Sequence, residues 1–143
     1  MANNSISDNH SWDFQDLMLY RVHEILLISS PYDAYILEQD GKLTEQILSE
    51  YIGMNLSYAP RVWNVSTGKA AIDILSKRNF DLVIIMMRIA DISSIDLGSK
   101  IRKRYPQKPI ILLAFDESEI KRISFKQKSI FDQIFIWFGD WID

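Results

Sequence analysis

Few residues in this chain have the chemistry that catalysis requires. The sequence contains no cysteine and only two histidines, His10 and His23. The lack of cysteine excludes a disulfide scaffold, a thiolate zinc site and a cysteine nucleophile. His10 lies in a polar N-terminal segment, and His23 begins a predicted strand, so we interpret His23 as a structural residue. Ser29 has none of the glycines that surround the serine of a nucleophile elbow.

The acidic residues do not form an obvious catalytic pair either. Asp116 and Glu117 stand together before a predicted helix, and Asp91 and Asp96 lie around the start of another. Carboxylates at such positions commonly stabilise helix starts or face solvent. We therefore predict that this chain is not an enzyme by itself.

The composition indicates one globular domain. The chain has 143 residues, of which 48% are hydrophobic and 24% charged, and its net charge is −3. The basic run from Lys100 to Arg104 suits the C-terminal end of a helix, and without a basic stripe we expect no nucleic-acid partner. No apolar run approaches the roughly 20 residues of a membrane helix. Residues 1–10 lack the apolar core of a secretion signal, so we expect a cytoplasmic location and no membrane partner.

Short apolar runs alternate with helical patterns from about residue 22 onward. Strands are predicted at Glu24–Ile28, Arg61–Val65, Leu82–Met87, Ile110–Leu113 and Gln133–Phe138. Helices are predicted around 43–52, from 66 or 67, from 93 or 94 up to Pro106, and over 116–123, with a turn or short helix at 31–40.

This alternation predicts an α/β domain over residues 21–143, preceded by a tail or extra helix over 1–20. The expected architecture is a three-layer, doubly wound, five-stranded parallel sheet in the flavodoxin-like order 2-1-3-4-5. In such sheets, sites form beyond the carboxyl ends of the strands. The residues at those ends are Ser29, Ser30, Met86, Met87, Ala114, Phe115, Trp137 and Phe138.

One segment resembles a known family. Residues 80–97, FDLVIIMMRIADISSIDL, resemble the third strand and following loop of response-regulator receiver (CheY-like) domains, which follow a D-L-V-L-L-D-x-R-M-P-D-M-D-G-x-E-L pattern. The resemblance extends, element by element, from about Val22 to the end of the chain. It implies the receiver fold and a place in two-component signal transduction or a phosphorelay.

The resemblance places the family's phosphorylation chemistry on residues that do not support it. The phosphorylatable aspartate falls at Met86, whose thioether has no anionic oxygen to attack a phosphoryl donor. The paired acids that help to bind magnesium fall at Ser29 and Ser30, whereas magnesium prefers hard, usually anionic oxygen ligands. Asp33 is close by in the sequence, and we interpret it as a helix cap rather than a metal ligand.

The remaining family positions also differ. The switch hydroxyl falls at Ala114, and the lysine after strand 5 falls at Trp137 or Phe138. The loop proline is Ala90 and the loop glycine is Ser94. The resemblance therefore implies a degenerate pseudo-receiver that needs no cofactor or metal and acts through protein contacts.

Aromatic and apolar residues concentrate near the end of the chain. They are Phe125, Ile130, Phe131, Phe135, Trp137, Phe138 and Trp141. Receiver domains commonly associate through helix 4, strand 5 and helix 5, so we predict an interaction face at Phe125, Phe131, Phe135 and Trp141. Its partner would be another protein, a neighbouring domain of the same chain or a second copy. Alternatively, these residues fill the core.

A second functional class is open from the sequence. Flavodoxin-like sheets bind flavin or nucleotide phosphates with a Ser/Thr-rich loop after strand 1. Ser29-Ser30-Pro31-Tyr32 is a weak version of such a loop, because Pro31 lacks an amide donor and no glycine allows a tight cradle.

Two features suggest that the chain is part of a longer protein. The SSPYDAYILEQDG and WFGD segments resemble receiver-like regions at the front of proteins with phosphoenolpyruvate-synthase or pyruvate-phosphate-dikinase domains. Receivers also carry a helix after strand 5, and this sequence ends at Asp143, about where that helix would begin.

Overall fold

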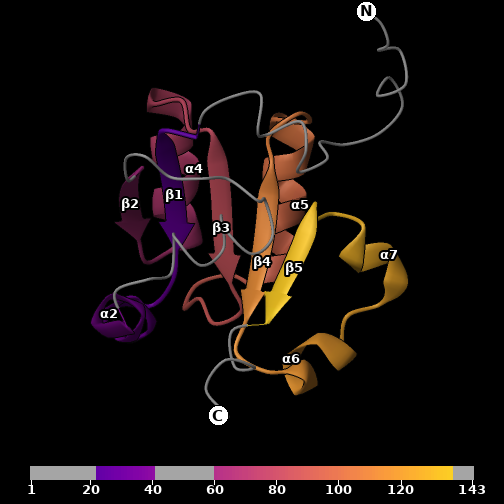
Figure 1. Cartoon of the computed structure of the whole chain (residues 1–143). Coiled ribbons are helices and arrows are strands. Elements are labelled where there is room, and N and C mark those ends of the chain that lie inside the picture. Colours follow the sequence, from indigo (N-terminus) through magenta and orange to yellow (C-terminus); the bar gives the residue numbers. More distant parts are fainter. Residues whose placement is uncertain (1–21, 41–59, 137–143) are drawn as a thin grey trace, which may run out of the picture.

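A computed structural model describes residues 22–40 and 60–136 of the chain. Five strands form one sheet in the order β2-β1-β3-β4-β5, and every neighbouring pair is parallel (Figure 1). The strands are β1 (Glu24–Ile28), β2 (Arg61–Val65), β3 (Leu82–Met86), β4 (Ile110–Ala114) and β5 (Gln133–Ile136). The predicted strand order and direction are confirmed.

The central strands owe their position to continuous apolar sequence. All five residues of β3 and all five of β4 are buried. In β1, Leu26 and Ile28 join the core that α4 and α5 cover, while Ile25 and Leu27 point to the other face and are buried as well. A strand buried on both faces is the expected form of a parallel sheet with two covering layers.

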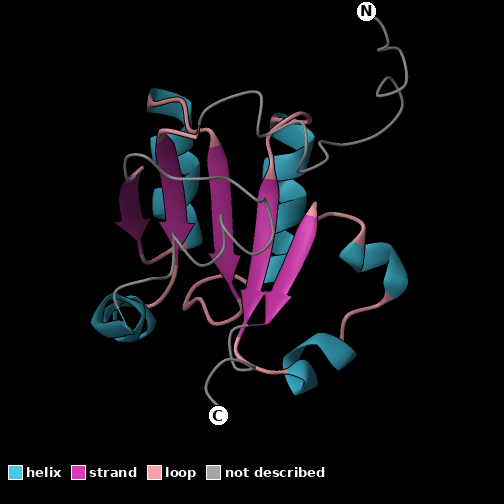
Figure 2. Cartoon of the chain, viewed as in Figure 1, coloured by secondary structure: helices cyan, strands magenta, loops and turns pink. Residues whose placement is uncertain are grey.

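Two helices, α4 (Gly68–Lys77) and α5 (Ser94–Arg104), cover the same face of the sheet (Figure 2). The side chain of Thr67 caps α4, and that of Ser93 caps α5. The sequence had left Ser66 or Thr67 open for the first helix and Ser93 or Ser94 for the second. The buried residues of α4 and α5 repeat at helical spacing, so each helix presents an apolar stripe to the sheet. These stripes contain Ala71, Leu75, Leu97 and Ile101.

Three further helices are described besides α4 and α5. Residues 31–40, for which a turn or short helix was predicted, form α2 (Pro31–Asp40) at the carboxyl end of β1 (Figure 1). The single helix predicted over 116–123 is wrong, because the chain forms α6 (Glu117–Lys121) and then α7 (Phe125–Lys128). Ser124 starts the second helix by a capping box with Gln127, a signal that sequence reasoning overlooked. The predictions for 1–20, 43–52 and 137–138 lie outside the described residues.

Arg102 connects α5 to the turns that precede β4 and β5. Its guanidinium donates to the carbonyl oxygens of Pro106, Lys108 and Ile130, at 2.8–3.1 Å. It also donates to Asp132 Oδ2 at 2.8 Å, and the same oxygen accepts the backbone N–H of Ile110 at 2.8 Å. The Asp132 side chain is only 1% exposed, so its charge depends on this arginine.

We predict that Arg102→Met destabilises the domain by about 3–5 kcal/mol, because the Asp132 carboxylate is then buried without a cation. Urea unfolding followed by circular dichroism measures this loss. Lys103→Met, at the exposed neighbouring position of the same helix, is the control and should change stability by less than about 0.5 kcal/mol. Equal effects of the two substitutions would show that Arg102 is not a structural link.

Candidate functional site

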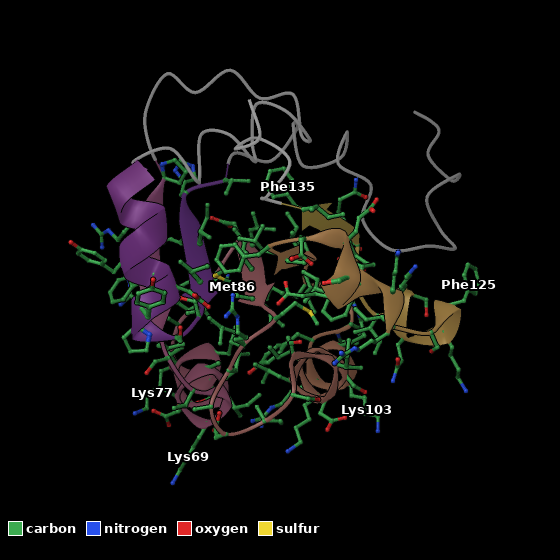
Figure 3. All side chains as sticks on the ribbon, turned by 90° about the horizontal axis from the view of Figure 1, so that it is seen from below. Lys69, Lys77, Met86, Lys103, Phe125 and Phe135 are labelled. Atoms are coloured by element: carbon green, nitrogen blue, oxygen red, sulfur yellow. The ribbon has the colours of Figure 1, made fainter. Side chains whose placement is uncertain are left out.

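The carboxyl edge of the sheet brings together the residues that sequence reasoning selected. Strand pairing aligns Ile28 with Ile85, and Met86 with Leu113. Ser29, Met86 and Ala114 are all fully buried, and Met86 lies in the interior of the molecule (Figure 3). The register pairs Ala114 with Ile136, so the strand residue beside Ala114 is Ile136. Trp137 and Phe138 lie outside the described residues.

Ser29 forms structural bonds at this edge. Its backbone N–H donates to the carbonyl of Val65 at 3.1 Å, which extends the pairing of β1 with β2 by one step. Its Oγ accepts a hydrogen bond from Asn64 Nδ2 at 3.0 Å, and the same amide donates to the carbonyl of Leu27 at 3.1 Å. Sequence reasoning missed Asn64, whose only signal was a polar amide inside a predicted strand.

Ser30 is the residue that caps α2. Its Oγ accepts the backbone N–H of Asp33 at 3.1 Å, and its carbonyl accepts the N–H of Ala34 at 3.0 Å. The interpretation of Asp33 as the cap is therefore wrong, since Asp33 lies in the first helical turn. Asp33 is 2% exposed, and its Oδ2 has no hydrogen-bond partner.

The residues at this edge of the sheet offer few ligands for a metal ion. Within the described residues, no group of three or more His, Cys, Asp or Glu side chains could hold a metal ion. A buried carboxylate such as Asp33 is usually paired or bonded to a metal. Magnesium takes a near-octahedral set of oxygen ligands, and Met86 contributes none to such a set.

The loop after β3 is held by contacts with α5, Phe115 and α6. Ser94 Oγ donates to the Met87 sulfur at 3.6 Å. The Arg88 guanidinium lies 5.1 Å from the centroid of the Phe115 ring and 3.9 Å from Glu119 Oε2. Glu119 Oε1 accepts the backbone N–H of Phe115 at 2.7 Å. The contacts of Arg88 and Glu119 join the loop to Phe115 and the start of α6.

Asp91 joins the same loop to α4. Its carboxylate accepts the backbone N–H of Gly68 at 2.8 Å and that of Lys69 at 3.1 Å. A Cβ on Gly68 would collide with the Ile92 side chain, so glycine at this position permits the close approach of the loop after β3 to the start of α4. Hydrogen bonds from the Gly68 and Lys69 amides outweigh the effect of desolvation and lower the pKa of Asp91 below its ordinary value of 3.8.

The predicted aromatic interaction face needs a correction. Phe131 is 6% exposed and Phe135 is 1% exposed, so both belong to the core. Phe131 packs on Gly98 of α5, where a Cβ would lie 2.8 Å from its ring. Strand alternation and helix contact turn these rings inward, which a count of aromatics could not reveal. Phe125, in contrast, is 89% exposed, and Trp141 lies outside the described residues.

A five-stranded parallel sheet in this order, with loops meeting at the carboxyl edge, defines the flavodoxin-like class of α/β domains. The family model for the response regulator receiver domain matches residues 36–135, well over half of the chain. The chain therefore belongs to the response regulator receiver domain family, and it is a receiver domain of signal transduction.

Individual relatives agree with this assignment. The chain is 30% identical over 83 residues to the probable transcriptional regulatory protein TcrX of Mycobacterium tuberculosis, a match that covers 56% of this chain and 35% of that protein. The chain thus matches about a third of the length of that curated relative.

Solved structures share the fold. The response regulator TrrA of Thermotoga maritima, in complex with Mg²⁺ and BeF, superposes with a TM-score of 0.58 at 20% identity, covering 80% of this chain and 85% of that chain. A CheY-like receiver domain of Methylobacillus flagellatus gives 0.58 at 16% identity, with 81% and 86% covered. TrrA has also been solved with the histidine kinase ThkA; that match gives 0.57 at 21% identity, with 80% and 84% covered. In the part of this chain that the structure describes, each helix is too short or too polar to cross a bilayer.

We predict that the Asp91 carboxyl titrates below pH 3.8 in the folded protein. Because the folded-state pKa is lowered, the stabilisation of α4 by Asp91 is complete above the unfolded-state pKa and is lost as the pH falls through the folded-state value. Carboxyl-detected NMR titration gives the midpoint, and exchange of the Gly68 and Lys69 amides should accelerate in Asp91→Asn. A midpoint at or above the ordinary value would contradict this contact.

Proposed function

We propose that this receiver domain is a pseudo-receiver, which transmits its signal through protein contact without being phosphorylated at the end of β3. The observation that carries this proposal is the identity and burial of Met86. A thioether cannot form an acyl phosphate, and the side chain is fully buried at a position that pairs with Leu113 of β4. Phosphoryl transfer also needs a metal or cationic groups to stabilise the developing charge.

The other positions at the edge support the same proposal. Ala114 has no hydroxyl to contact a phosphate, and Ile136 beside it has no charge. The Ser29 hydroxyl is already bonded to Asn64. Asp33 is the one carboxylate near this edge with an unpartnered oxygen within the described residues, and a single carboxylate is a poor magnesium site.

Contact with other proteins lets a domain carry information without phosphorylation. TrrA, which shares the fold, forms a complex with the histidine kinase ThkA. We propose a protein partner for this chain too, either a separate protein, a neighbouring domain of the same chain or a second copy. The absence of enzymatic activity is part of this proposal. The resemblance to front regions of phosphoenolpyruvate-synthase-type proteins stays a prediction about a longer parent chain.

We predict that a small phosphoryl donor such as acetyl phosphate, with Mg²⁺, adds no phosphoryl group to this protein. The expected result is an unchanged intact mass, and amide NMR with Mg²⁺ and beryllium fluoride should show no saturable shifts at Ser29, Met86 or Ala114. A phosphorylatable receiver treated in parallel shows that the donor is active. A mass increase that disappears in Asp33→Asn would overturn the proposal and identify Asp33 as the acceptor.

We also predict that an aspartate at the end of β3 is not tolerated as a charged group. Met86→Asp should destabilise the domain by about 3–5 kcal/mol, because its carboxylate would be buried without a compensating cation. Met86→Leu keeps the apolar volume and should cost less than about 1.5 kcal/mol. Chemical denaturation measures both variants. A stable Met86→Asp protein that takes up a phosphoryl group would mean that the edge retains working phosphorylation machinery.

A further inference from the structure

The most exposed large apolar side chain in the described part of the molecule is Phe125, at 89% exposure. It is the first residue of α7 and points away from the body of the domain, on the side opposite α2 (Figure 3). We propose that Phe125 and the cations around it form a docking site for an acidic segment of a partner protein, one that offers an apolar socket for the ring. This inference rests on the proposed contact function and specifies the chemistry of the partner.

The backbone around Phe125 is well fixed. The Ser124 side chain accepts the N–H of Gln127 at 3.1 Å, and the Gln127 side chain accepts the N–H of Ser124 at 3.0 Å. The hydroxyl of Ser129 closes the other end of the turn by donating to the Lys126 carbonyl at 2.6 Å. Because the turn is already ordered, a partner would lose little conformational freedom on binding the ring.

Buried residues on both sides tie this turn to the core. Ile123 precedes it at 7% exposure, and Phe131 follows it at 6%. The Ile123 and Ile130 amides donate to the carbonyls of Ile120 and Gln127, at 2.9 and 3.1 Å. Phe125 therefore lies between two buried residues, Ile123 and Phe131, and the path of the backbone between them leaves its side chain exposed.

The positive charge around Phe125 indicates the chemistry of the partner. Residues 121–129, KRISFKQKS, contain four cations and no acidic residue, in a chain whose net charge is −3. The four are Lys121, Arg122, Lys126 and Lys128, all exposed. The ion pairs within the described residues join Lys77 to Asp73, Arg88 to Glu119, and Arg102 to Asp132, so none neutralises this group. Complementarity favours a partner with clustered carboxylates, which would speed association and fix its orientation.

A protein fits this surface better than a nucleic acid or a membrane. Asp116, Glu117 and Glu119 lie on the adjoining α6 region, so a short acidic segment can contact the cations of residues 121–129 alone, whereas a continuous phosphate backbone or an anionic bilayer would also meet these carboxylates and be repelled. The four-residue helix α7 is also far shorter than an amphipathic membrane helix, and it exposes a single large apolar side chain. Aromatic side chains are enriched where proteins meet, and they often carry much of the binding energy there.

A random 12-residue peptide library, displayed on phage and selected on the immobilised full chain, tests this proposal. We expect the selected peptides to be rich in Asp and Glu and to share at least one aliphatic or aromatic residue. Binding of a selected peptide should shift the amide signals of residues 121–129 and weaken as salt is raised. Phe125→Ala and the pair Lys126→Ser/Lys128→Ser should each lower its affinity about tenfold.

Matched substitutions elsewhere on the surface are the controls. Tyr35 of α2 is also an exposed aromatic, at 60%, and Lys69 and Lys103 extend from α4 and α5 away from Phe125 (Figure 3). Tyr35→Ala and Lys69→Ser/Lys103→Ser should leave peptide affinity unchanged. Phe125 contributes little to packing, so Phe125→Ala should retain the thermal midpoint of the original chain.

Each other outcome overturns the docking site in a different way. Peptides that bind Phe125→Ala and the original chain equally would leave the contact function standing but place it elsewhere. A library without enrichment, together with co-sedimentation of the chain with phosphatidylserine vesicles, would identify a lipid surface as the partner. A library without enrichment and no vesicle binding would reject the site. None of these readouts depends on phosphorylation, so the phosphoryl-donor experiment tests the proposed function separately.

Discussion

β1, β3 and β4 pair in parallel through residues that are buried nearly without interruption, and every other feature of the domain depends on this pairing. The register aligns Ile28 with Ile85 and Met86 with Leu113, so the loops that follow these strands must meet at one edge. The same pairing turns alternate side chains toward α4 and α5 on one face. The edge is therefore positioned by hydrophobic burial, which has no direction of its own, and by backbone hydrogen bonds, which do.

Carboxylates hold the turns around this sheet in place. Asp81 Oδ2 accepts the amides of His23 and Glu24 at the start of β1, and Asp132 Oδ2 accepts the amide of Ile110 at the start of β4. Asp91 bonds two amides at the start of α4. In each case an acidic side chain satisfies backbone donors that the sheet or helix leaves open. Asp81, Asp132 and Asp91 thus each have a structural role at the start of a strand or helix.

The receiver fold and the chemistry of its edge are separate properties of this chain. The framework that positions the edge belongs to the response regulator receiver family. Met86 and Ala114 fill the edge with apolar atoms, whereas the exposed ring of Phe125 and the cations Lys126 and Lys128 occur together on α7. The proposed contact function and the proposed docking site both follow from this contrast.

The sequence by itself determined the strands, their order and the starts of α4 and α5, because these follow from local patterns. Continuous apolar runs marked β3 and β4, and the caps of α4 and α5 were each narrowed to two neighbouring residues, of which the structure uses Thr67 and Ser93. Met86 at the carboxyl end of β3 was also predictable, since it needed only the correct position of one strand.

The sequence could not predict contacts between residues that lie far apart in the chain. Arg102 with Asp132, Asn64 with Ser29, and Asp91 with Gly68 depend on how the elements pack. For the same reason only the tertiary structure decided which aromatics are exposed: Phe131 and Phe135 are turned into the core by helix and strand packing, while the capped turn of α7 leaves Phe125 outside.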